Sequence, residues 1–103
     1  MAEILEVTEG LKYQSADESL GYQITTTNWV SSPTSPVVVA YDEADNSVVT
    51  STVFPTNSPS VSGDVISLSL LKSLTNGHNY RIEVKFTVGS NIYECYFRVK
   101  CIR

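Results

Sequence analysis

Few residues in this chain of 103 have the type and spacing that chemistry needs. The single histidine, His78, stands in a loop with no cysteine, aspartate or second histidine at the spacing of a zinc site or of a nucleophile and its base. Three carboxylates, on Asp42, Glu43 and Asp45, fall within four residues and could form a weak calcium site, but the glycine and distal glutamate of an EF-hand loop are missing. We therefore interpret His78 as a surface residue and residues 42–46 as a solvated turn, with no metal and no cofactor.

The motifs of common catalytic sites are also missing from the sequence. It has no glycine-rich phosphate loop, no serine elbow and no H-E-x-x-H motif. A carboxylate pair acting as acid and base would have to combine the acidic turn with an unrelated strand, which the sequence does not indicate. We expect a protein that is not an enzyme, with no catalytic residues and no small-molecule ligand.

Two cysteines, Cys95 and Cys101, are six positions apart in one predicted strand. At the usual rise per residue they would lie about 20 Å apart, which is too far for a disulfide bond. The sequence therefore predicts two reduced, buried thiols with no redox or metal role.

The most regular hydrophobic pattern lies between residues 66 and 88. Apolar side chains occupy every second position from Tyr80 to Val88, with polar or charged side chains between them. This alternation predicts a strand with one buried and one exposed face. Isoleucine and leucine alternate with serine over residues 66–70, which predicts a second strand that leads into the first.

The connection between these two strands has a characteristic spacing. Leu74, Gly77 and Tyr80, followed by alternating apolar positions, resemble the L-x-P-G-x-x-Y-x-x-x-V run of fibronectin type III domains, with Asn76 in place of the usual proline. The resemblance implies a tyrosine corner, in which the Tyr80 hydroxyl binds backbone just upstream. Trp29, before a Ser/Pro loop, resembles the tryptophan that crosses the core in the same family. Tyr80 could instead be an ordinary core residue, and Trp29 an exposed binding residue.

Further short strands are predicted at residues 20–26, 37–41, 47–54 and 92–102. Residues 55–63, rich in proline, serine and asparagine, are interpreted as a long surface loop that crosses between sheets, and Gly89 and Ser90 as a hairpin turn. No segment has a convincing helical pattern. Residues 1–19 are interpreted as an N-terminal arm or edge strand, and residues 20–103 as one domain.

About seven strands in one chain predict an all-β fold, an antiparallel two-sheet sandwich that is immunoglobulin-like or fibronectin type III-like. A small barrel is the structural alternative. The predicted core lies between the two sheets and consists of Ile24, Trp29, Leu68, Tyr80, Ile82, Val84, Phe86, Tyr93, Cys95, Phe97 and Val99.

Charge and hydropathy exclude several classes of partner. A net charge of −4 and a pI near 4.8, without a cluster of basic residues, argue against binding to nucleic acid or to an anionic membrane. No stretch approaches the roughly 20 apolar residues of a membrane helix, and the first residues are acidic where a secretory signal is basic. We expect a protein without a signal peptide, made and kept inside a cell.

A second resemblance covers most of the chain from Leu20 onward. The order L-x-Y-x-I, Trp29 before a loop, a Thr/Ser/Val-rich middle, then a G-x-x-Y strand, a glycine turn and a final strand is similar to immunoglobulin-like virion or tail-adaptor proteins of tailed bacteriophages and prophages. Gln23 and Thr25 depart from the L-D-Y-x-I-D-W pattern of many adaptors. The resemblance implies a virion structural protein that is made in the host cytoplasm and binds itself or other virion proteins.

Three classes of function remain open at this point. The leading one is a non-catalytic structural or assembly protein of a bacteriophage or prophage virion, acting through protein–protein contacts. The alternative is a carbohydrate- or protein-binding accessory module, immunoglobulin-like or fibronectin type III-like, from a larger extracellular protein. An intracellular enzyme with an unrecognised site is the third.

The candidate interface is the exposed face of the last strand, where Tyr96 stands between Glu94 and Arg98. Tyrosine and arginine are enriched where proteins meet. If this strand is an edge, its unpaired backbone groups would also invite another chain to extend the sheet. We expect contacts that involve residues 92–103 and the 55–63 loop.

Overall fold

Strands dominate the fold, which a computed structural model describes for residues 4–27 and 29–102, with side chains from residue 11 onward. In chain order the elements are β1 (Ile4–Gln14), β2 (Gln23–Thr25), β3 (Thr34–Asp42), β4 (Ser47–Val48), α1 (Thr50–Val53), β5 (Ser60–Ser62), β6 (Val65–Ser67), β7 (Asn79–Val88) and β8 (Asn91–Cys101). The described residues thus form eight strands, where the sequence predicts about seven.

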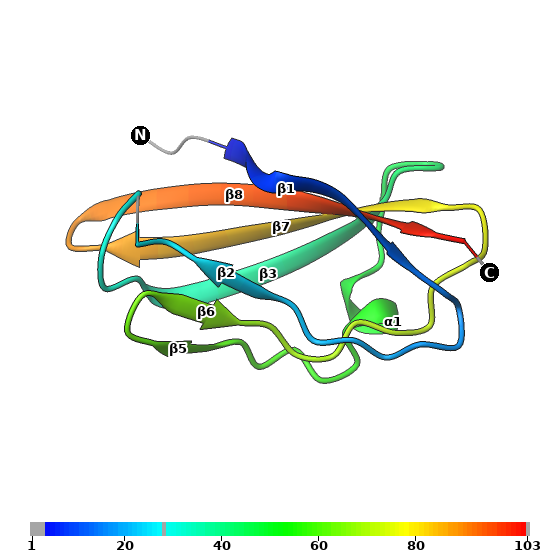
Figure 1. Ribbon diagram of the computed structural model, residues 1–103, viewed down its shortest axis with the longest axis horizontal. Helices are drawn as coiled ribbons and strands as arrows, with labels where there is room; N and C mark the ends of the chain where they lie inside the picture. The colour runs from blue at the N-terminus through cyan, green and yellow to red at the C-terminus, as the bar shows by residue number, and fades with distance from the viewer. Residues whose placement is uncertain (1–3, 28, 103) are drawn as a thin grey trace.

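The strands form two sheets that lie one over the other (Figure 1). The larger sheet has the order β1-β8-β7-β3-β4 and the smaller sheet has the order β2-β6-β5. All neighbours are antiparallel except β1, which runs parallel to β8. The prediction of an all-β fold with two sheets is confirmed.

The long hairpin of β7 and β8 forms the centre of the larger sheet. Its strands pair without a break from Asn79 with Lys100 to Val88 with Asn91. Gly89 stands in the tight turn with φ of 60°, a conformation that suits glycine best. Burial alternates along both strands, as the hydrophobic pattern predicts.

The core lies between the two sheets. Of the residues predicted for it, all are buried except Trp29 and Tyr93, which pack against it while partly exposed. The sequence-based list omits further buried residues, which are Val38, Ala40, Val53, Phe54, Ile66, Leu71, Leu74 and Cys101. Several of these come from segments without regular alternation, which explains why a periodicity argument does not find them.

The N-terminal strand closes one side of the sandwich. Gln14, at the end of β1, is buried and donates from Nε2 to the carbonyl oxygens of Leu71 at 2.6 Å and of Glu18 at 3.1 Å. Its Oε1 accepts a hydrogen bond from the Tyr22 hydroxyl at 2.9 Å. Because both ends of the amide are satisfied, this buried polar side chain ties the two sheets together.

The prediction of a strand over residues 47–54 is wrong beyond Val48. The chain instead turns into the single helical turn α1, in which the Phe54 amide donates to the Thr50 carbonyl at 2.8 Å. The Thr50 hydroxyl accepts the Ala40 amide at 3.0 Å, where a continued strand would have offered a carbonyl. The turn places Val53 and Phe54 side by side in the core, which alternation along a strand would not do.

Two further boundaries differ from the prediction. The end of the predicted 55–63 loop is a strand, β5, which forms a hairpin with β6. Regular β6 ends at Ser67, and the alternation slips after it, so that Leu70 is exposed and Leu71 is buried. Leu71 pairs instead with Leu20 through two backbone hydrogen bonds of 2.8 and 3.1 Å.

Candidate interaction surface

The outer face of the five-stranded sheet, on the side away from the smaller sheet, carries the predicted interface residues. Within residues 4–27 and 29–102, no other element packs over this face (Figure 1). Its side chains come from alternate positions of β1, β8, β7 and β3, and they mix charged, aromatic and aliphatic types. We call this surface the outer face.

The register of the sheet lines up these side chains in rows across the strands. One row over four strands consists of Leu11, Arg98, Arg81 and Tyr41, and the next row consists of Tyr96, Glu83 and Val39. Directly opposite side chains in antiparallel strands have Cβ atoms about 5 Å apart. The two arginines are therefore direct neighbours, and without compensation their like charges would destabilise the sheet.

Glu43, in the turn after β3, provides that compensation. Its Oε1 accepts hydrogen bonds from Nε and Nη2 of Arg98 at 3.1 and 2.9 Å, and its Oε2 lies 3.5 Å from Nη1 of Arg81. Glu83 accepts a further hydrogen bond from Nε of Arg81 at 2.9 Å. These four groups are only partly exposed, so their attraction is screened less than that of fully solvated ions.

Tyr41 completes this arginine cluster. The Arg81 guanidinium carbon lies 4.7 Å from the centre of the Tyr41 ring, which is a cation–π contact. The cluster therefore holds two guanidinium groups and an aromatic ring in fixed positions. A contact made through these side chains would lose less side-chain entropy than one made through freely rotating arginines.

The three predicted interface residues occupy this face, but with different surroundings. Arg98 belongs to the arginine cluster. Tyr96 is partly exposed and stands opposite Glu83, and Glu94 stands opposite Lys85. Sequence reasoning did not find the role of Glu43, because it treated the acidic turn as solvated. The signal that could have found it is the pairing of β3 with β7, which places the residue after Asp42 beside Arg81.

The last strand is not an edge, which corrects one part of the interface hypothesis. β8 lies between β7 and β1, so its backbone groups are paired on both sides over much of its length. β1 therefore occupies the edge of β8 at residues 94–96 and 98–101, where another chain would otherwise extend the sheet. The 55–63 loop belongs to the side of the smaller sheet, away from the outer face.

Tyr80, Leu74 and Gly77 meet at the crossing that precedes β7. The Tyr80 ring is buried, and its hydroxyl accepts a hydrogen bond from the Thr75 amide at 2.7 Å. Leu74 is buried beside it, and Gly77 has φ of 86°, which other residues rarely adopt. This is the geometry that the resemblance to fibronectin type III domains implies for the tyrosine.

Trp29 lies at the other end of the core. Its ring meets the rings of Phe86 and Tyr93 edge-on, with both pairs of centroids 5.4 Å apart. Such contacts stabilise a core beyond the area they bury. Of the two alternatives for Trp29, packing against the core describes its position.

His78 has a partner that its sequence neighbours do not suggest. Its Nδ1 lies 2.7 Å from Oδ2 of Asp42, at the end of β3. The pair links the end of β3 to the loop before β7.

The acidic turn does not gather its carboxylates around one point. Asp42 accepts the Ala44 amide, Glu43 faces the arginines, and Asp45 accepts both the amide and the hydroxyl of Ser47. The Ser47 hydroxyl, followed by its amide, lowers the pKa of Asp45. Among the described residues no three acidic, histidine or cysteine side chains come together in a way that could hold a metal ion.

Cys95 and Cys101 are buried, as predicted, and no disulfide bond joins them. Burial raises the pKa of Cys95 to about 11, so its thiol stays protonated at neutral pH. A protonated, inaccessible thiol is a poor nucleophile.

No helix in the described ranges has the length and hydropathy to cross a bilayer.

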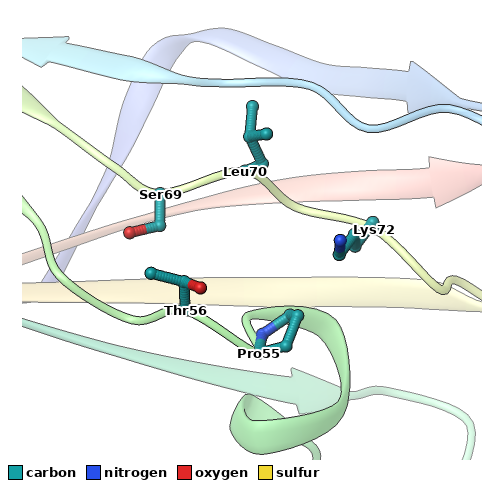
Figure 2. A pocket seen from close by; sticks show the side chains of 5 residues that line it. All are labelled: Pro55, Thr56, Ser69, Leu70 and Lys72. Carbon is teal, nitrogen blue, oxygen red and sulfur yellow. The ribbon is translucent and has the colours of Figure 1, made fainter.

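A shallow depression lies on the opposite side of the molecule from the outer face. It has a volume of about 320 Å³ and is lined by Pro55, Thr56, Ser69, Leu70 and Lys72 (Figure 2). The segments on its two sides are tied by hydrogen bonds from Lys72 to Val53 and from Ser58 to Ser69. The lining mixes two apolar side chains with the polar side chains of Thr56, Ser69 and Lys72.

Comparisons of the chain with protein-family models, curated proteins and solved structures find no match.

Proposed function

We propose that this protein is a non-catalytic assembly module of a bacteriophage or prophage virion, and that it acts through protein–protein contacts made by the outer face. The observation that carries the proposal is the arginine cluster. Arg81, Arg98 and Tyr41 stand side by side on an uncovered sheet, fixed by Glu43. Arginine and tyrosine are among the side chains that most often anchor protein interfaces.

The electrostatics of the face favour a protein partner over nucleic acid. Each arginine in the cluster faces a carboxylate from this chain, on Glu43 or Glu83, and the whole chain carries a net charge of −4. Binding to nucleic acid requires basic groups that neutralise phosphates. A mixed surface of paired charges, tyrosines and exposed aliphatic residues such as Leu11 matches the composition of protein interfaces instead.

The proposal includes an immunoglobulin-like fold and a place in the virion. In constant-type immunoglobulin domains the first, second, fifth and fourth strands form one sheet, and the seventh, sixth and third strands form the other. The orders β2-β6-β5 and β8-β7-β3 support this assignment, with β4 as an added strand beside β3, whereas β1 departs from it because it lies beside β8. The resemblance to tail-adaptor-like proteins then supports a protein that is made in the host cytoplasm and assembles there.

Self-association is the branch that can be tested without knowing another partner. Sedimentation velocity from micromolar to millimolar concentration should show reversible association of the parent. The double variant Tyr96→Ala, Arg98→Glu should associate at least tenfold more weakly, because it removes one aromatic side chain and reverses one charge in the cluster. Lys72→Glu makes the same change of charge on the other side of the molecule and should associate like the parent.

Two results would contradict the self-association branch. A parent that stays monomeric over the whole range would exclude it. Equal weakening by Lys72→Glu would show that net charge, and not the outer face, controls association. Thermal unfolding of each variant checks that the fold is retained.

A further inference from the structure

Most sheet edges in this protein are closed against the addition of another strand. At the β4 side of the larger sheet, the Ala40 amide and carbonyl are bonded to Thr50 Oγ1 at 3.0 Å and to the Val49 amide at 2.9 Å. The Val38 carbonyl accepts a hydrogen bond from Asn57 Nδ2 at 3.1 Å. Both backbone groups of Ala40 and the carbonyl of Val38 are therefore already occupied at this edge.

The other outer strands carry different protection. On β1, Lys12 aligns with the buried Val99, so a charged residue faces inward between Leu11 and Tyr13. An inward-pointing charge on an edge strand opposes pairing with another chain. β5 follows Pro59, which has no backbone N–H to donate to an added strand.

β2 is the exception among the described edges. The Tyr22 carbonyl accepts the Leu68 amide at 2.9 Å, and the Thr26 amide donates to the Asp64 carbonyl at 2.8 Å, so even-numbered residues face β6. Backbone groups alternate in direction along a strand, so those of Gly21, Gln23 and Thr25 point away from the sheet. All three residues are exposed, and their outward backbone groups have no hydrogen-bond partner among the described residues.

We infer that the open edge of β2 pairs with β2 of a second copy of this chain. An antiparallel pair with its twofold axis at Gln23 places Gln23 opposite Gln23 of the second copy, and Gly21 opposite Thr25. The outward groups of these residues then form six backbone hydrogen bonds across the axis. The two three-stranded sheets become one sheet of six strands, a contact that is separate from the outer face.

The sequence of this edge suits pairing with itself. Residues 20–27, LGYQITTT, contain no Asp, Glu, Lys, Arg, His or Pro, so no like charges meet across the axis. The two Gln23 amides each offer a donor and an acceptor, so they can bind one another. A second copy therefore supplies the hydrogen-bond groups that this edge lacks, and the pairing brings no like charges together.

An exposed leucine beside the edge adds an apolar contact. Leu70 Cδ2 lies 3.7 Å from the position of a Cβ on Gly21, and the Leu70 side chain is 54% exposed. Figure 2 shows Leu70 pointing away from Thr56, toward the segment that leads into β2. In the paired form the methyl group of Thr25 from the second copy lies over Gly21, and it covers part of Leu70.

A single cysteine placed on the axis tests this geometry. In Gln23→Cys the two Cα atoms would be about 5.5 Å apart, which a disulfide can bridge. In Thr25→Cys the two cysteines would be offset by four residues, or about 13 Å, which is too far. Cys95 and Cys101 are buried and give little background. Under mild oxidation, a disulfide dimer of Gln23→Cys but not of Thr25→Cys is the expected result. Equal crosslinking of both variants, or of neither, would overturn the inference.

A charge swap provides the second test. In the Tyr96→Ala, Arg98→Glu background, which disables the outer face, Gln23→Lys and Gln23→Glu should each self-associate about fivefold more weakly than that background, because like charges then meet on the axis, and an equimolar mixture should recover association. A mixture that associates no more strongly than either variant alone would overturn the inference.

Repeating the Gln23→Cys crosslink in the Tyr96→Ala, Arg98→Glu background separates the two proposals, since the edge dimer should persist when the outer face is disabled. Loss of the crosslink there would show that the edge is not an independent contact.

Discussion

Arg98 donates two hydrogen bonds to one oxygen of Glu43, at 3.1 and 2.9 Å, across a separation of 55 positions in the sequence. The contact matters because the sheet places Arg98 directly beside Arg81. Glu43 binds both, and so one carboxylate allows two adjacent guanidinium groups to stay on one face. The proposed contact surface and a structural ion pair thus use the same residues.

Replacing Glu43 by Ala should therefore destabilise the fold by about 1 kcal/mol, because two arginines are left facing one another. The loss should decrease in high salt, which screens the repulsion. Urea unfolding at low and high ionic strength measures both effects. The double variant Glu43→Ala, Arg98→Ala is the control, since it removes the repulsion and should recover part of the stability. A loss that does not change with salt would contradict this electrostatic explanation.

Removing the hydroxyl of Tyr80 should cost about 0.5 to 1.5 kcal/mol and leave the fold intact, because the Thr75 amide loses its acceptor. Tyr93→Phe is the matched control, since the Tyr93 hydroxyl has no hydrogen bond to any described residue and its loss should change stability by less than about 0.5 kcal/mol. Chemical unfolding measures the free energy of unfolding of both variants and of the parent. Unchanged stability of Tyr80→Phe would leave Tyr80 as an ordinary core residue.

Phe86→Ala should cost roughly 3 to 5 kcal/mol, because Phe86 is fully buried and contacts the rings of Trp29 and Tyr93. That is a large share of the stability of a small domain. Ile92→Ala, at an exposed position of the next strand, should change stability by less than about 1 kcal/mol. Thermal melting is sufficient to distinguish them. A Phe86→Ala protein that melts within a few degrees of the parent would mean that the face assignment of β7 is wrong.

The raised pKa of Cys95 predicts a loss of stability in alkaline solution. The thiol ionises near pH 9 in the unfolded chain and at about 11 in the folded protein, so between these values the folded state holds a proton that the unfolded state has lost. Its contribution is fully present below pH 9 and decreases as pH rises to 11, by about 1.4 kcal/mol per pH unit. Unfolding free energies from pH 8 to pH 11 should decrease more steeply for the parent than for Cys95→Ala. Parallel curves would contradict a buried, protonated thiol.

Regular alternation let the sequence predict the central hairpin well. Along β7 and β8 every second side chain is apolar, and burial follows that pattern. Around Thr50 the same β-branched composition suggests a strand, but the Thr50 hydroxyl takes the place of a ladder carbonyl and the chain turns into a helix. Local composition cannot show this competition, since it depends on Ala40 from another segment.

The sequence predicts only part of the candidate site, because several of its contacts join segments that are far apart in the chain. The outward direction of Arg98 follows from alternation along one strand. Its partner Glu43, and the contact of Asp42 with His78, depend on how β3 pairs with β7. The parallel pairing of β1 with β8 likewise removes the edge that the interface hypothesis needed, and it joins segments from the two ends of the chain.

Lysine footprinting is the most direct test of the outer face as the contact surface. Lys85 and Lys100 stand at outward positions of β7 and β8, whereas Lys72 lies on the opposite side of the molecule and is exposed. Acetylation rates measured by mass spectrometry in dilute and in concentrated protein compare the free and associated forms. We expect Lys85 and Lys100 to react several times more slowly in the associated form while Lys72 keeps its rate. Equal rates in both forms for all three lysines, in a solution where sedimentation shows association, would contradict the proposed role of the outer face.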